Sequence, residues 1–244
     1  MQEQGTRRAR PHTGRTEDGR RVREVLTYSR RQRRLSGRQT EIWDKHAAEW
    51  WIPDAAADIV AFDPADWFGR VAPLVVEIGS GIGETASALA ENRPEANVLA
   101  FEVWRPGIAE TFVRLEQRGL ANVRLISVDA VWSIEHLLAP ETISELWTFF
   151  PDPWPKTRHL RRRLVNPHFA HVASTRLRQG ALWRLATDAP GYATQMEEVL
   201  SAEPLLRNVY DGPAPRWSDR PVTRFERRGL RAGRPITDLV FWRV

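Results

Sequence analysis

One carboxylate has a sequence context that favours chemistry. Asp152 lies between Pro151 and Pro153 in the segment FFPDPWPK, directly after an apolar run. Proline fixes φ near −65°, so the flanking prolines predict a rigid backbone around this acid. The segment from Lys156 to Arg163 then holds five cations and no acid. A rigid acid beside these cations indicates a site that holds a polar substrate group next to a polyanion; a structural turn before a basic helix face is the alternative.

Three further acids stand at the ends of three successive apolar runs, and Asp152 follows the fourth. They are Glu77, Glu102 and Asp129. The carboxyl ends of parallel strands meet at one edge of a sheet, where ligands bind in open α/β folds. Each acid alone is explained as a helix cap or a surface charge. All of them together predict one site.

A glycine-rich turn follows the first of these runs. Gly79, Gly81 and Gly83 allow the backbone to take positive φ and to approach a ligand closely. Glu84 stands where a dinucleotide-binding turn has its third glycine, and its charge would repel a pyrophosphate. Glu102 comes 19 residues after Gly83, at the distance typical of a ribose ligand. The pattern favours a nucleoside without phosphates, and S-adenosylmethionine fits it.

The chain alternates short apolar runs with amphipathic stretches, which predicts an α/β fold with a mostly parallel sheet. We expect an antiparallel C-terminal edge strand, because the last two strand candidates are joined by an Arg- and Pro-rich connection over 211–235. The expected strands are Leu74–Ile78, Val98–Glu102, Val123–Val128, Leu146–Phe150, Ala181–Thr187, Leu205–Val209 and Leu239–Val244. The expected helices are Gln39–Trp51, Glu84–Asn92, Pro106–Arg118, Ile134–Leu138, Pro167–Arg178 and Tyr192–Ala202.

Charge is unevenly distributed over the 244 residues. Residues 1–38 hold 12 Arg and 4 acids, whereas residues 39–244 hold 24 Lys and Arg and 27 acids. This predicts a basic, largely disordered arm over 1–38 and one folded domain over 39–244. The absence of Cys excludes thiol nucleophiles and disulfides, and fits a cytoplasmic protein. No apolar run has the length of a membrane span.

Together these motifs resemble the bacterial tRNA (guanine-N7)-methyltransferases, whose fold is the class I S-adenosylmethionine-dependent, Rossmann-like one. The resemblance covers roughly residues 70–244, and the basic segment YSRRQRRL at 28–35 adds to it. The matching segments are EIGSGIG (77–83), FEVWRPG (101–107), VDA (128–130), FFPDPWPKTRHLRRRLV (149–165), ATD (186–188) and PVTRFERRG (221–229).

The resemblance implies transfer of a methyl group to N7 of guanine 46 in the tRNA variable loop. It implies Asp152 as the catalytic residue and a cofactor site of Glu77, Gly79, Gly81, Gly83, Glu102, Asp129, Ala130 and Asp152. The implied substrate-binding residues are Lys156, Asp188, Thr223, Arg224, Phe225 and Glu226, and the implied RNA contacts are Arg158, His159, Arg161, Arg162 and Arg163. We expect no metal, and a monomer or a homodimer. Pro155 and Arg224 depart from the family pattern.

The chemistry is consistent with this residue set. Guanine N7 carries an in-plane lone pair, so the enzyme needs no general base and must mainly orient the reactants. Asp152 can accept hydrogen bonds from the N1–H and N2–H₂ edge and stabilise the cationic product. Trp154 either stacks on the base or packs in the core. Two other functions stay open: methylation of an rRNA or a protein, and RNA binding without catalysis.

Overall fold

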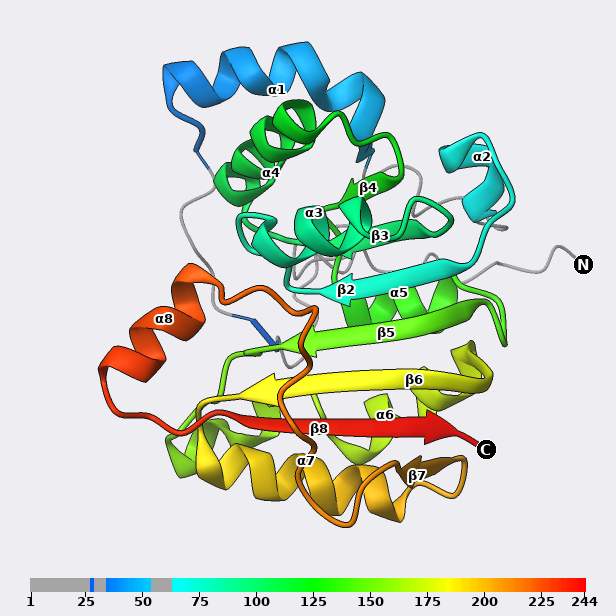
Figure 1. Cartoon of the computed structure of the whole chain (residues 1–244), viewed down its shortest axis with the longest axis vertical. Coiled ribbons are helices and arrows are strands. Elements are labelled where there is room, and N and C mark those ends of the chain that lie inside the picture. The colour runs from blue at the N-terminus through cyan, green and yellow to red at the C-terminus, as the bar shows by residue number, and fades with distance from the viewer. Residues whose placement is uncertain (1–26, 29–33, 54–62) are drawn as a thin grey trace, which may run out of the picture.

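The computed structural model describes residues 27–28, 34–53 and 63–244. In this part of the chain, helices cover both faces of a single eight-stranded sheet (Figure 1). The strands are β1 Trp51–Ile52, β2 Leu74–Ile78, β3 Asn97–Phe101, β4 Val123–Ile126, β5 Ile143–Phe149, β6 Leu177–Thr187, β7 Leu206–Asn208 and β8 Thr237–Arg243. The helices are α1 Gly37–Trp50, α2 Pro64–Phe68, α3 Glu84–Glu91, α4 Arg105–Arg118, α5 Ala130–His136, α6 Pro167–Arg176, α7 Pro190–Ala202 and α8 Arg224–Arg231, with a 3₁₀ helix at Thr157–Arg162.

The strand order is β1-β4-β3-β2-β5-β6-β8-β7. Strands β1 to β6 pair in parallel, and β8 pairs antiparallel with both β6 and β7. This confirms the predicted mostly parallel sheet with an antiparallel C-terminal part, although β7 rather than the last strand is outermost. Because the chain runs outward from β2 on one side and from β5 on the other, the order reverses between these two strands. A crevice at the carboxyl ends of the strands is expected at such a point.

The apolar pattern of the central strands explains why both faces are covered. All five residues of β2 are buried. Leu74 and Val76 join a core shared with α2, α5, α6 and α7, whereas Val75 points to the opposite core, shared with α1, α3 and α4. Successive side chains of a strand point to opposite faces, so a continuous apolar run requires helices on both. Within the described residues, no helix has the length and apolar character needed to span a bilayer.

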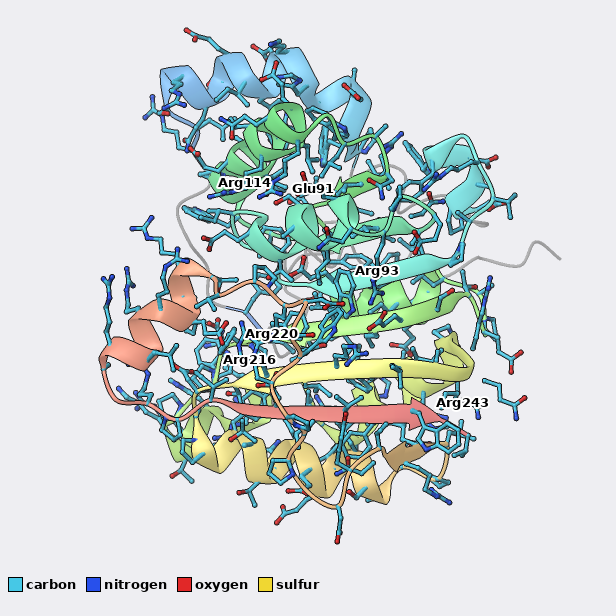
Figure 2. All side chains as sticks on the ribbon, in the orientation of Figure 1. Glu91, Arg93, Arg114, Arg216, Arg220 and Arg243 are labelled. Atoms are coloured by element: carbon cyan, nitrogen blue, oxygen red, sulfur yellow. The ribbon has the colours of Figure 1, made fainter. Side chains whose placement is uncertain are left out.

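Helix α8 was not predicted, because its residues fall in the Arg- and Pro-rich connection. The Thr223 hydroxyl caps it by accepting a hydrogen bond from the Glu226 N–H at 3.2 Å. Only Glu226 and Gly229 are buried within the helix. Arg216 and Arg220, from the segment before α8, lie near the helix, whereas Arg243 is at the other end of the sheet (Figure 2). Polar contacts rather than an apolar stripe therefore position α8.

Candidate active site

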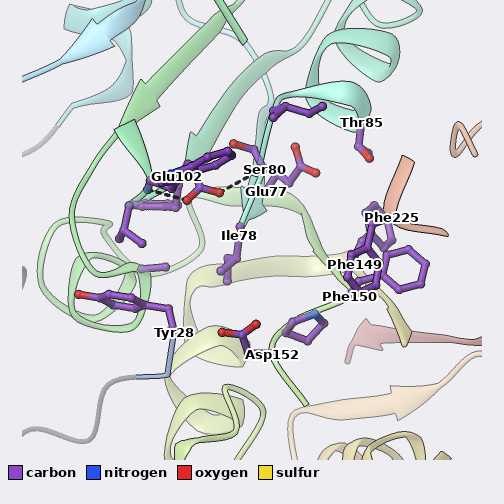
Figure 3. A pocket seen from close by; sticks show the side chains of 18 of the residues that line it. Tyr28, Glu77, Ile78, Ser80, Thr85, Glu102, Phe149, Phe150, Asp152 and Phe225 are labelled. Carbon is purple, nitrogen blue, oxygen red and sulfur yellow. Dashed lines mark hydrogen bonds between the residues drawn. The ribbon is translucent and has the colours of Figure 1, made fainter. Parts of the chain in front are cut away.

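A cavity of about 580 Å³ opens at the carboxyl ends of β2, β3 and β5. This volume is within the usual range for a small-molecule site. Nine of the predicted site residues line it: Glu77, Gly79, Gly81, Glu102, Ala130, Asp152, Thr223, Arg224 and Phe225. Figure 3 shows Glu77 and Glu102 on one side of the space and Asp152 on the other. The tertiary structure thus brings together three of the four acids that the sequence placed at strand ends.

The glycine turn after β2 is shaped for close approach. Gly79, Gly81 and Gly83 have φ values of 77°, 61° and 74°, which side-chain-bearing residues rarely adopt. Gly83 has no room for a side chain, since a Cβ there would lie 2.3 Å from Cγ2 of Thr111. A Cβ on Gly107 would lie 2.2 Å from the Gly81 carbonyl oxygen. Helix α4 therefore packs directly against the turn and holds it in place.

Glu102 reinforces the same turn from β3. One of its carboxylate oxygens accepts a hydrogen bond from the Gly81 N–H, and the other accepts from the Trp104 N–H, each at 2.7 Å (Figure 3). The carboxylate thus bridges the turn and the start of α4. Its place beside the cavity also suits the ribose contact predicted for it.

Glu77 is the most perturbed acid of the site. Its side chain is buried, and Oε2 has no hydrogen-bond partner among the described residues. Burial raises the pKa of Glu77 to about 8, repulsion from Glu102 adds to the rise, and a hydrogen bond from the Ala86 backbone opposes it. A nearby Ser80 hydroxyl is also buried and lacks a partner in the described structure. Two orphaned polar atoms in one cavity wall fit a ligand that brings a cation or a donor.

The backbone around Asp152 is strained as well as proline-bound. Phe150 and Trp154, two residues before and after it, have positive φ values of 53° and 41°. Residues other than glycine adopt such angles at a cost of about 1–3 kcal/mol each, and they cluster at functional sites. The Phe150 N–H donates to the Ala186 carbonyl at 2.7 Å, which ties the segment to the end of β6. The turn therefore presents Asp152 at a fixed place in the cavity wall.

Arg163 corrects one prediction. It was expected to contact RNA, but it is only 8% exposed. Its guanidinium donates to the carbonyls of Pro153 and Gly191 at 2.9 and 3.1 Å and to Gln195 Oε1 at 2.5 Å, and it lies over the Tyr192 ring. Arg163 is therefore an internal support of the Asp152 turn and is not available to a phosphate.

Trp154 neither lines the cavity nor packs in the core. The Arg162 guanidinium lies 3.5 Å from its ring centroid, and its indole N–H donates to the Thr27 carbonyl at 3.0 Å. Arg162 also donates to the Tyr28 carbonyl at 3.1 Å. These contacts hold Thr27 and Tyr28 against the Asp152 turn, and both residues line the cavity.

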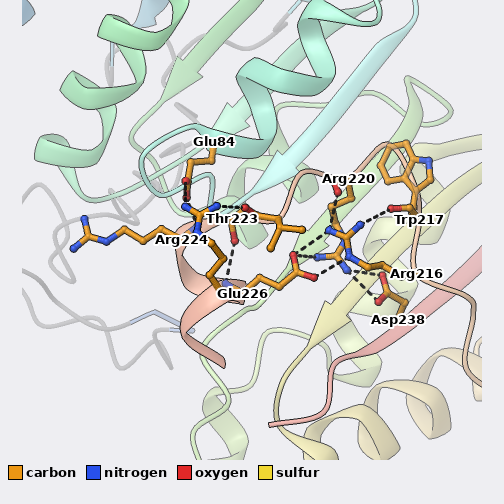
Figure 4. A network of polar contacts seen from close by, with 10 residues as sticks. Glu84, Arg216, Trp217, Arg220, Thr223, Arg224, Glu226 and Asp238 are labelled. Carbon is orange, nitrogen blue, oxygen red and sulfur yellow. Dashed lines mark hydrogen bonds and ion pairs between the residues drawn. The ribbon is translucent and has the colours of Figure 1, made fainter. Parts of the chain in front are cut away.

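The N-terminal turn of α8 forms another wall of the cavity. Thr223, Arg224 and Phe225 line it, and the rings of Phe225 and Phe150 have centroids 5.3 Å apart. Glu84, the first residue of α3, accepts a hydrogen bond from the Arg224 N–H at 2.7 Å (Figure 4). The helix that bears the predicted substrate residues is thereby attached to the glycine turn.

Glu226 corrects a second prediction. It was expected to bind the substrate, but it is 1% exposed. Its carboxylate accepts hydrogen bonds from Arg216 and Arg220, each at 2.9 Å, and Arg220 also donates to Asp238 in β8 (Figure 4). Glu226 is therefore the buried anion that fixes α8 to the sheet.

Several other predicted residues lie outside the cavity wall. Asp129 caps α5 by accepting from the Trp132 N–H at 3.0 Å, and burial raises its pKa. Asp188 accepts from Arg234 at 2.7 Å, near the end of α8, and Lys156 is exposed. Their expected contacts with cofactor or substrate stay predictions.

Other parts of the prediction have only a partial test. The predicted arm, 1–38, lies mostly outside the described residues, so the division into arm and domain stays a prediction. In the described part of the chain, no three His, Cys, Asp or Glu side chains gather as a metal site.

Sequence reasoning also missed several cavity residues, among them Tyr28, Ser80, Trp104, Phe150 and Arg228. Each of these residues lies in a segment that resembles the family pattern, and the aromatic pair before Pro151 also carried a local signal, because an aromatic pair at a strand end suits a planar ligand.

Comparison with protein families and curated relatives gives a consistent result. Residues 71–239 match the family model described as a putative methyltransferase. A tRNA (guanine-N(7)-)-methyltransferase from a Nocardioides species is 57% identical, over 98% of this chain and 95% of its own length. A protein of the same name from Cutibacterium acnes is 48% identical, over 90% of this chain and 83% of its own length.

Solved structures support the fold alone. The 16S rRNA methyltransferase KamB superposes with a TM-score of 0.55 at 15% identity, covering 75% of this chain and 95% of that one. The 16S rRNA (adenine(1408)-N(1))-methyltransferase from Catenulisporales acidiphilia has a TM-score of 0.53 at 20% identity, over 75% of this chain and 94% of that one.

Proposed function

The chain belongs to the tRNA (guanine-N7)-methyltransferase family. From this premise we propose that it transfers the methyl group of S-adenosylmethionine to N7 of guanine 46 in the tRNA variable loop. The products are 7-methylguanosine in the tRNA and S-adenosylhomocysteine. The observation that carries the proposal is the cavity beside β2 and β5, where the strand order reverses. Glu77 and Glu102 lie on one side of it and Asp152 on the other.

The cavity wall fits S-adenosylmethionine. Glu77 would hold the ammonium group, since its buried carboxylate has an oxygen without a partner in the described structure and accommodates its charge best beside a cation. Glu102 and the glycine turn would hold the ribose, and Ala130 would border the adenine. The absence of a phosphate in this ligand agrees with Glu84 at the start of α3.

When bound, the cofactor supplies an electrophilic methyl group. The protein residues then orient the guanine, because N7 is already nucleophilic and requires no base. Asp152 would accept hydrogen bonds from the N1–H and N2–H₂ edge, and its negative charge would stabilise the cationic purine that forms. The strained backbone on both sides of Asp152 keeps this carboxylate in place as charge develops.

The acceptor base would pack against an aromatic wall of the cavity. Phe150 and Phe225 face the cavity beside Asp152, and aromatic rings stack on unpaired RNA bases. Trp154, the residue expected to stack on the base, has the Arg162 guanidinium on its ring instead. We therefore assign base stacking to the two phenylalanines.

The exposed cations after Asp152 would bind tRNA phosphates. Lys156, Arg158 and Arg161 are exposed, and no acid of the described structure pairs with them. Burial, followed by repulsion from Arg158 and Arg162, lowers the pKa of His159. His159, beside these cations, would contact RNA through a hydrogen bond.

Site mapping tests the proposal directly. Purified protein is incubated with S-adenosylmethionine and a tRNA transcript, and 7-methylguanosine is located by borohydride and aniline cleavage followed by primer extension. We expect one stop at guanine 46, and none in a transcript with adenine there. A stop at another guanine would refute only the proposed position, guanine 46. Methylation of an rRNA or a protein in place of tRNA would refute the substrate. A cytoplasmic location, a metal-free reaction and a monomeric or homodimeric state stay predictions.

A further inference from the structure

The segment from Arg216 to Arg234 contains seven arginines, and the structure divides them into two groups. Four of them pair with carboxylates inside the protein: Arg216 with Glu226, Arg220 with Glu226 and Asp238, Arg227 with Glu84, and Arg234 with Asp188. The other three are Arg224, Arg228 and Arg231, and their guanidinium groups have no ion pair within the described residues. All three are exposed.

These three arginines form one stripe on α8. Their spacing of four and then three residues places them on the same helix face. That face is opposite Glu226 and Gly229, the two buried residues of the helix. Arg224 and Arg228 also line the cavity, so the stripe begins at the opening and continues along α8 to Arg231. Figure 4 shows the Arg224 side chain extending away from the ion-pair network.

The paired arginines fix the helix that carries the stripe. Glu84 holds its first turn, Glu226 holds its middle through Arg216 and Arg220, and Asp188 holds the segment after its end through Arg234. A helix with so few buried apolar residues thus has a fixed place beside the cavity. The three exposed charges are preorganised, which lowers the entropy lost when they bind a ligand.

We propose that Arg224, Arg228 and Arg231 form a second phosphate-binding surface, which follows the RNA strand that enters the cavity. From Arg224 to Arg231 the helix rises about 10 Å, at 1.5 Å per residue. That length lets the stripe face more than one phosphate of the same strand. A row of cations without internal partners, starting where the acceptor base must enter, is complementary to a polyanion attached to that base. This inference rests on the proposed function and adds α8 to the RNA contacts expected after Asp152.

The test is the salt dependence of tRNA binding by the full chain. The Arg228→Gln, Arg231→Gln double variant removes two proposed contacts and leaves the ion-pair network intact. Each phosphate contact contributes about 0.7–0.9 to the slope of log affinity against log salt, so the slope of the variant should be about 1.4–1.8 smaller. The ratio of wild-type to variant affinity should then fall about tenfold between 50 and 200 mM salt. Affinity for S-adenosylmethionine, measured by calorimetry on the Arg231→Gln single variant, whose site lies outside the cavity wall, should not change.

Arg178→Gln is the matched control for lost charge. Arg178 is exposed near the start of β6, the end of that parallel strand away from the cavity, and donates only to the Glu141 carbonyl in the described structure. Its variant should keep the wild-type slope. An unchanged slope in the double variant, or the same decrease in the control, would overturn the inference. If the wild-type protein methylates tRNA while the double variant keeps its slope, this inference alone fails. If the wild type neither binds nor methylates tRNA, the proposed function fails.

Discussion

The Arg224 N–H donates a hydrogen bond to a Glu84 carboxylate oxygen at 2.7 Å, across 140 residues of sequence. This contact joins the first residue of α3, after the glycine turn, to the first residue of α8. A second contact, from the Arg227 guanidinium to the other Glu84 oxygen, is 3.3 Å long. The wall that would bind the cofactor and the wall that would bind guanine are therefore attached at one carboxylate.

Replacing Glu84 by alanine should loosen α8. The change leaves the Arg224 N–H without its acceptor, and a hydrogen bond to a charged group contributes about 1.5–3 kcal/mol. Partial exposure reduces that value, so we expect the local opening free energy of α8 to fall by about 1 kcal/mol. Hydrogen exchange measured by mass spectrometry on peptides covering 222–232 checks this. Peptides from α7 are the internal control, and Glu84→Gln, which keeps an acceptor, should show a smaller effect. Unchanged exchange at α8 in Glu84→Ala would show that this carboxylate does not hold the helix.

Asp152→Asn should remove most of the methyl transfer without preventing cofactor binding. Loss of one preorganised electrostatic contact lowers rates by about 10²–10³. Transfer of labelled methyl groups to tRNA measures the rate, and calorimetry measures the affinity for S-adenosylmethionine. Asp219→Asn is the control, because Asp219 is exposed and outside the cavity wall. Wild-type activity in the Asp152 variant would remove Asp152 from the catalytic role.

Glu77 should make both stability and cofactor affinity depend on pH. Its pKa is about 8 in the folded protein and near 4.5 when unfolded, so the folded state binds the extra proton between these values. The contribution of Glu77 to the free energy of unfolding is fully present below about pH 4.5 and is lost as pH rises toward 8. The free energy of unfolding falls by at most about 1.4 kcal/mol per pH unit over this range. Urea denaturation of the cofactor-free protein between pH 5 and 8 measures this fall.

Cofactor binding should have the opposite pH dependence. An ammonium group favours the ionised carboxylate, so binding at pH 7 should release a proton, and affinity should rise toward pH 8. Calorimetry in two buffers of different ionisation enthalpy detects that proton. Glu77→Gln should abolish the proton release and flatten the stability curve. Proton release of equal size in this variant would assign it to another group.

Gly107→Ala should destabilise the glycine turn through a steric clash with its backbone. Its Cβ would lie 2.2 Å from the Gly81 carbonyl oxygen, and overpacking of this kind costs about 1–3 kcal/mol. Gly191→Ala is a matched control in α7, because its Cβ would meet no atom within 4 Å. Alanine is the better helix former by about 1 kcal/mol, so the control should be neutral or stabilising. Chemical denaturation of both variants, with S-adenosylmethionine binding by each, checks the difference. Equal stability of the two variants would mean that the turn can shift at little cost.

Variants of Arg163 and Arg161 should affect different properties, protein stability for Arg163 and tRNA binding for Arg161. Arg163→Met leaves the Pro153 and Gly191 carbonyls without their donor, which should lower the free energy of unfolding by about 2–4 kcal/mol. Arg161→Gln changes an exposed residue and should weaken tRNA binding with little effect on stability. Thermal unfolding and tRNA titration of both variants measure the two effects. A stable Arg163 variant with weakened tRNA binding would restore Arg163 to the RNA contacts.

Local signals in the sequence were sufficient for most of the sheet and for part of the site, but β1 was missed and Trp51 was expected in a helix. The apolar runs, the glycines and the prolines each act through a few neighbouring residues, so Leu74–Ile78 could be predicted as a strand and Asp152 as a fixed acid. The apolar pattern predicts a helix from Ile134, but α5 begins at Ala130, because Asp129 caps it there. α8 was missed because its stability depends on ion pairs with distant residues.

By itself, the sequence determined that four acids end successive strands and that a rigid aspartate precedes a basic segment. Only the tertiary structure decided which charges are available to a ligand. Arg163 and Glu226 have the same local appearance as their exposed neighbours, yet both are buried against partners from other elements. Charge pairing depends on distance in space, and the fold brings Glu84 to Arg227 and Arg220 to Asp238 across intervals that no local pattern encodes.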